Sequence, residues 1–115
     1  MHAGDTYWNG IYPFIDYSTG GSIDGMIAAC DASLKAATNE TIIIPGHGHP
    51  VSDKFGLKEF RDMLAVIRDN VAVLKKQGRS REETAAAKPT AAFDAKWGNS
   101  VIDPGFFTRL VYEGV

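Results

Sequence analysis

Apolar positions recur at helical spacing in two long segments of the chain. The first stripe consists of Ile23, Met26, Ile27, Cys30 and Leu34. The second consists of Leu57, Phe60, Met63, Leu64, Val66, Ile67, Val71 and Leu74. Steps of three and four residues place each set on one face of a helix, so the pattern predicts helices over about 23–37 and 56–77. Ser22 precedes the first as an N-cap, and Gly78 follows the second as a glycine just past a helix end.

Capping signals predict shorter helices in the last third of the chain. Ser80 and Glu83 form a capping box that opens a helix through about residue 87. Asp103-Pro104 combines an N-cap with a proline at the first helical position, which predicts a further helix from there. The inward residues of that helix are predicted to be Phe106, Phe107, Leu110 and Val111. One more helical turn is expected over about 89–96.

Strand signals are fewer and lie in the first half of the chain. Thr41-Ile42-Ile43-Ile44 is a β-branched run stopped by Pro45, which predicts a buried strand over 41–45. Residues 1–21 are rich in glycine and aromatics, a mixture that predicts a strand ending near Asp5 and then a loop over 7–17 held by ring packing. About five helices with two or three short strands predict a helix-rich α+β fold with too little strand to close a sheet alone.

Composition narrows the class of protein. A length of 115 residues suits a single domain over 1–115, and 12 Lys and Arg against 14 Asp and Glu argue against a dedicated nucleic-acid binder. No apolar stretch approaches the roughly 20 residues that span a bilayer, and the first residues lack a signal-peptide pattern. We therefore expect a cytoplasmic protein without membrane or nucleic-acid partners. One cysteine cannot form an internal disulfide.

Two short motifs carry candidate chemistry. In the first, an apolar strand runs into Pro45-Gly46-His47-Gly48, where flanking glycines allow a metal or substrate to approach the imidazole closely. In the second, Asp5 follows Gly4 and could bridge two cations through its carboxylate oxygens. Simpler interpretations stay open: a loop histidine bonded to backbone, and a solvated turn carboxylate. His49 is interpreted as an exposed loop side chain, and His2 as a structural or exposed strand residue.

Together these motifs resemble the metallo-β-lactamase superfamily of αββα hydrolases, which includes glyoxalase II. In that family a strand ending in Gly-Asp supplies a metal-bridging carboxylate, and a later strand ending in Pro-Gly-His-Gly supplies a histidine ligand. The matching residues here are Asp5 and His47. Segments 9–22 and 88–98 also look like one branch of the superfamily, so the resemblance covers nearly the whole chain. It implies a helix-rich half of an αββα sandwich with a small sheet.

The chain departs from the family at its other metal ligands. Members carry a His-x-His-x-Asp-His motif and a further histidine before the Gly-Asp strand, whereas this chain has three histidines in all and none of them precedes His2. A catalytic zinc normally needs three protein ligands and an open position. The resemblance therefore implies the C-terminal half of the fold, with two inherited ligand positions and an incomplete zinc site.

These observations give two expectations for function. The first is an oligomeric binding or assembly module that is not catalytic alone. The alternative is a zinc-dependent hydrolase of an ester, thioester or lactam, whose metal site is completed by oligomerisation or by a partner chain. Without the other half, a sheet face and a strand edge would be exposed, which predicts self-association as a two-fold dimer. The contact is expected to involve the strand near 1–5, the loop at 7–17 and the helix at 56–77.

Overall fold

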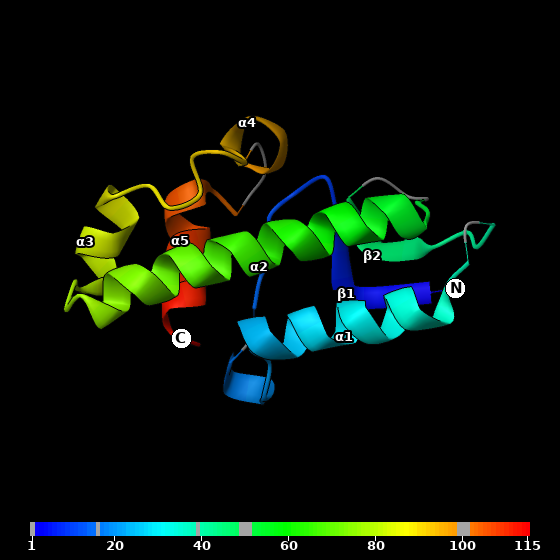
Figure 1. Cartoon of the computed structure of the whole chain (residues 1–115), viewed down its shortest axis with the longest axis horizontal. Helices are drawn as coiled ribbons and strands as arrows, with labels where there is room; N and C mark the ends of the chain where they lie inside the picture. The colour runs from blue at the N-terminus through cyan, green and yellow to red at the C-terminus, as the bar shows by residue number, and fades with distance from the viewer. Residues whose placement is uncertain (1, 16, 39, 49–51, 99–101) are drawn as a thin grey trace.

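The computed structural model of the chain describes residues 2–15, 17–38, 40–48, 52–98 and 102–115 (Figure 1). In this part of the chain, five α-helices accompany a two-stranded sheet, which makes the fold a small α+β domain. In chain order the elements are β1 (His2–Asn9), a 3₁₀ turn (Tyr17–Thr19), α1 (Ile23–Ala36), β2 (Ile44–Gly48), α2 (Lys54–Lys76), α3 (Arg81–Ala86), α4 (Asp94–Trp97) and α5 (Pro104–Tyr112). The predicted α+β class is confirmed.

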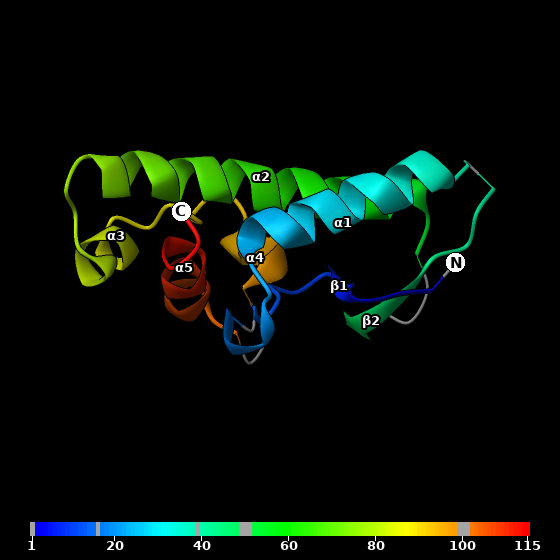
Figure 2. The ribbon, with the colours of Figure 1, turned by 90° about the horizontal axis from the view of Figure 1, so that it is seen from below.

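The helices α1 and α2 form one layer of the molecule. They lie side by side, and the strands and α5 lie together on one side of them (Figure 2). Ion pairs join the two helices at Arg61–Asp31 and Arg68–Asp24, with nitrogen–oxygen distances of 2.7 and 2.9 Å. The longer helix, α2, also contacts β1, α3 and α5. It is therefore the element on which the rest of the molecule packs.

Local capping bonds determine where the helices begin. The side chain of Ser22 accepts a hydrogen bond from the backbone N–H of Gly25, and Ser80 forms the predicted capping box with Glu83. Asp103 caps α5, with proline at its first position as predicted. The helix predicted over 56–77 begins earlier, at Lys54, because the Asp53 side chain caps it by accepting a hydrogen bond from the backbone N–H of Gly56. The helical turn predicted over about 89–96 forms later, as α4 at Asp94–Trp97, and residues 89–93 form turns before it. The other predicted helices lie within about one residue of their predicted bounds.

The two strands pair in parallel and form the sheet. The register aligns Gly4 with Pro45 and Trp8 with His47, so the strands that carry the two motifs are neighbours, as expected. The predicted strand ends were wrong. β1 continues past Asp5 to Asn9, because aromatic residues favour a pleated strand. β2 occupies 44–48 and not 41–45, because Ile43 is instead held by two backbone hydrogen bonds to Ser52, both 2.8 Å.

Rings fill much of the core between the helix layer and the sheet, which confirms the predicted ring packing. Tyr7 of β1 is fully buried against Phe60 of α2, with ring centroids 5.2 Å apart. Tyr12 stacks on Phe107 of α5 at 4.7 Å. The prediction that Phe106 points inward was wrong, because its side chain is 42% exposed while that of Phe107 is buried. Adjacent residues on a helix point about 100° apart, so one of the two rings must leave the core.

Candidate functional site

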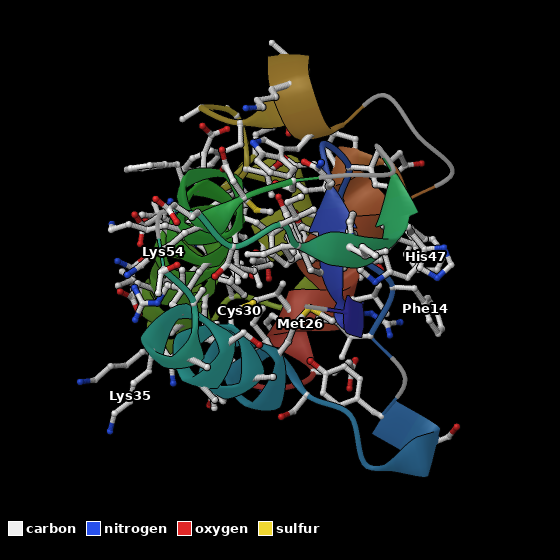
Figure 3. The ribbon with its side chains drawn as sticks, turned by 90° about the vertical axis from the view of Figure 1, so that its right-hand side faces the viewer. Phe14, Met26, Cys30, Lys35, His47 and Lys54 are labelled. Carbon is white, nitrogen blue, oxygen red and sulfur yellow. The ribbon has the colours of Figure 1, made fainter. Side chains whose placement is uncertain are left out.

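His47 lies near the end of β2 and packs against an aromatic ring from β1. Its imidazole stacks on the indole of Trp8, with centroids 3.8 Å apart and planes 21° from parallel. The strand register creates this pair, because it aligns the two residues directly. His47 is exposed, and Figure 3 shows it on the side of the ribbon away from α1 and α2. The histidine of the Pro-Gly-His-Gly motif is therefore held by stacking within the sheet and does not sit in a loop beyond it.

The second candidate ligand is only partly described. The backbone of Asp5 belongs to β1, in the middle of the strand, whereas its side chain lies outside the described residues. The side chain of His2 and the whole of His49 also lie outside them. In register, His47 faces Trp8, three residues beyond Asp5. The structure thus brings the two strands together, and it packs His47 on the indole ring of Trp8.

A zinc ion requires three protein ligands that converge. Among the described residues, no group of three His, Cys, Asp or Glu side chains is close enough to hold a metal. His47 is the one histidine whose side chain belongs to the described part of the chain. Cys30, the single thiol, is buried in α1, and burial raises its pKa to about 12, which disfavours the thiolate that binds metals. The described residues therefore do not fit a zinc site.

The strand signal at Ile42-Ile43-Ile44 is buried on one side and exposed on the other. Ile43 is fully buried, whereas Ile42 and Ile44 are 62% and 43% exposed. Continuous apolar runs are typical of strands that are covered on both faces. Of this run only Ile44 belongs to β2, and only Ile43 is buried. The run therefore has the composition of a doubly covered strand, while two of its three isoleucine side chains meet solvent.

Aromatic rings are also exposed on the surface of the molecule. Phe14 is 43% exposed and contacts exposed Phe106 of α5, with centroids 6.3 Å apart. Figure 3 shows Phe14 and His47 both on the side opposite Lys35 and Lys54 of the helix layer. We call the two ring pairs, Trp8 with His47 and Phe14 with Phe106, the ring patch. The sequence does not predict this patch, because it does not show which of the adjacent rings, Phe106 or Phe107, packs in the core.

A buried polar network fixes the segment that carries Phe14. The Tyr12 hydroxyl donates to Asp94 Oδ1 at 2.7 Å, and the Thr90 hydroxyl donates to the same oxygen at 2.7 Å. The Tyr12 backbone N–H also donates to the carbonyl of Trp97 at 2.9 Å. Burial, and then the bond to Asp94, raise the pKa of the Tyr12 phenol. This network anchors the segment that leads from Tyr12 to Phe14, and no sequence pattern indicates it.

A pocket of about 350 Å³ lies elsewhere, between α2 and Phe93. Phe55, Met63 and Val66 form most of its apolar lining. The charged groups at its rim are already engaged, because Lys58 pairs with Asp62 at 2.6 Å and Glu59 pairs with Lys96. Ligand sites usually combine an apolar lining with polar groups that converge on the ligand. These charges pair with one another, so the pocket offers little to orient a ligand.

In the described part of the chain, the helices are too short or too polar to cross a membrane. No family model matches the chain, and no match to it was found among curated proteins or solved structures. The ring patch and the stacked His47 are therefore interpreted from their own geometry.

Proposed function

We propose that this chain corresponds to the C-terminal half of a metallo-β-lactamase-like sandwich and acts as a binding and assembly module, without catalysing hydrolysis alone. The observation that carries the proposal is the uncovered side of the sheet. Ile44 at the start of β2 and Ile42 just before it are exposed in an apolar run whose composition suits burial on both sides, and the rings of Phe14 and Phe106 are exposed as well. Large exposed apolar patches mark interaction sites on soluble proteins. The function proposed is thus to dock another protein layer.

The strand arrangement supports the ancestral part of the proposal. Gly4-Asp5 and Pro45-Gly46-His47-Gly48 lie on adjacent parallel strands, with a capped helix between them in sequence. Helices cover one side of these strands, as in one half of an αββα sandwich. The described ligands support the absence of independent catalysis, since they do not converge as zinc requires.

Zinc content and turnover test whether the chain is a module or an enzyme. The purified chain is loaded with zinc, dialysed and assayed against a β-lactam, an ester and a thioester. We expect less than one zinc per chain and no zinc-dependent turnover, with a fluorescent hydrophobic dye binding to the dilute protein. The matched variants are Asp5→Ala and His47→Ala, with Tyr112→Phe as a control away from the sheet.

Two results would contradict the proposal. Zinc-dependent turnover that Asp5→Ala and His47→Ala both abolish would establish the hydrolase instead. A protein that neither binds the dye nor associates at any concentration would show that the exposed rings are not a docking surface.

A further inference from the structure

We infer that two residues at the start of α2, Ser52 and Gly56, position the stacked rings of β1 and β2. The stack is that of Trp8 and His47. Ser52 lies just before the helix, and Gly56 lies in its first turn. The inference deepens the proposed function, on which its relevance to docking rests, because it names the residues that hold one of the ring pairs in place.

The pairing of the two strands does not by itself fix which residue faces His47. Gly4 pairs with Pro45, and Trp8 pairs with His47. A step from position 4 to 8 along β1 therefore matches a shorter step, from 45 to 47, along β2. Extra residues in one strand interrupt the ladder, and a slip by one residue would turn its side chains to the other face. A contact outside the ladder is needed to select the observed alignment.

Ser52 supplies such contacts to both strands. Its backbone N–H and carbonyl bond those of Ile43, just before β2, at 2.8 Å each. Its hydroxyl shares a 2.6 Å hydrogen bond with that of Tyr7, the residue before Trp8 in β1. Tyr7 and Ile43 are both fully buried. Because neighbours in a strand point to opposite faces, holding Tyr7 inward turns Trp8 outward, where His47 stacks on it.

Gly56 leaves the room that the hydroxyl bond needs. A Cβ at this position would lie 2.2 Å from the Ser52 hydroxyl oxygen and 2.9 Å from that of Tyr7. A side chain there would therefore push the serine hydroxyl out of the bond. Glycine is otherwise a poor choice for a helix, which alanine favours more. The bond between Tyr7 and Ser52 thus accounts for a glycine in the first turn of α2.

These contacts couple the start of α2 to the outer face of the sheet. In the described part of the chain, Ser52 is the hydrogen-bond partner of the Tyr7 hydroxyl. A buried hydroxyl that loses its partner is costly, so displacement of Ser52 favours a shift of Tyr7 toward another partner. Trp8 follows Tyr7 in the strand and moves with it, which separates the indole from the imidazole of His47.

Proton NMR of the His47 ring in the full chain tests the inference. Stacking on an indole moves these ring protons upfield, and their signals are those that His47→Gln removes. Ser52→Ala and Gly56→Ala should each lose most of the upfield shift, because both changes break the bond to Tyr7. In Ser52→Ala combined with Tyr7→Phe, neither hydroxyl is left unpaired. The combined loss of stability should therefore be smaller than the sum of the two single losses.

Two matched variants separate positioning from stability. Gly25→Ala adds a methyl group at the third residue of α1, the position that Gly56 has in α2, and its Cβ would lie 3.0 Å from the Ser22 hydroxyl. Ser80→Ala removes the capping hydroxyl of α3, at the other end of α2 (Figure 1). Loss of this cap should lower stability. Both variants should leave the His47 signals unchanged.

The outcomes decide the inference separately from the proposed function. Circular dichroism first verifies folding; Gly56→Ala keeps every hydrogen-bonding group, so it decides the test if Ser52→Ala does not fold. A folded variant of either kind that keeps the parent shift of His47 would overturn the inference. A parent chain without an upfield shift would also overturn it, because there would be no stack to position. Docking is judged on the parent chain by dye binding and turnover, so each proposal can fail while the other stands.

Discussion

The buried network around Asp94 makes a quantitative prediction for Tyr12→Phe. This change removes one hydroxyl and retains the ring, which is fully buried and stacked on Phe107. The lost bond is a 2.7 Å contact to a carboxylate, and hydrogen bonds to charged groups contribute about 1.5–3 kcal/mol. Thr90 still donates to the same oxygen, so the carboxylate keeps one partner. We therefore expect the free energy of unfolding to fall by about 2 kcal/mol, a decrease of about 8 °C in Tm.

Tyr112→Phe is the control for this experiment. Its hydroxyl donates to the backbone carbonyl of Arg79 at 2.8 Å in an exposed position, so its removal should cost less than about 1 kcal/mol. Urea unfolding followed by circular dichroism measures both variants. If Tyr12→Phe loses no more stability than Tyr112→Phe, the network does not anchor the segment that carries Phe14, and the reasoning is refuted.

The same phenol predicts how stability depends on pH. Burial raises the pKa of Tyr12, and burial likewise raises the pKa values of Tyr7 and Tyr17. A phenol whose folded pKa exceeds its unfolded value of about 10 stabilises the fold fully below that pH, and this contribution is lost as pH rises further. Unfolding and tyrosinate absorbance should therefore rise together above about pH 10, and Tyr12→Phe should weaken this dependence.

Three further substitutions and one chemical reaction test individual residues. Thr84→Val should stabilise the fold by about 1 kcal/mol, because the Thr84 hydroxyl is buried without a hydrogen-bond partner among the described residues. Lys88→Gly should raise stability by about 0.5 kcal/mol, because Lys88 has a φ of 55°. Gly48→Ala should cost about 3 kcal/mol or more, because a Cβ would lie 2.0 Å from the Asn9 carbonyl oxygen. Calorimetry measures all three. Ellman's reagent should react with buried Cys30 only as fast as the protein opens, since burial raises its thiol pKa to about 12.

Features set by local chemistry could be predicted from the sequence. The caps at Ser22, Ser80 and Asp103 act within three residues of themselves, so the helix starts that they mark agree with the structure. The start of the long helix was expected two residues late, because its apolar stripe begins only at Leu57, whereas the Asp53 cap bonds the N–H of Gly56 and starts the helix at Lys54.

Features that depend on distant contacts could not be predicted. The choice between Phe106 and Phe107 for the core is made by Tyr12, which lies far away in sequence. The partner of His47 is fixed by irregularities in the register between Gly4 and Trp8, which no pattern in either strand indicates. The pairing of the two motif strands was thus predictable from the sequence. The ring patch was not, because its residues come from three segments that are far apart in the chain.

The parallel pairing of β1 and β2 has a consequence for biosynthesis. A parallel partner cannot be reached by a tight turn, so β1 pairs with β2 only after the whole stretch from Asn9 to Gly48 has been made. At roughly 5–20 residues per second, this takes about two to eight seconds on the ribosome. Tyr7 is enclosed later still, because Ser52 hydrogen-bonds its hydroxyl and Phe60 packs against its ring, and both residues are made after β2. The strand synthesised early is thus among the last to be enclosed, and the nascent chain exposes its aromatic residues throughout that interval.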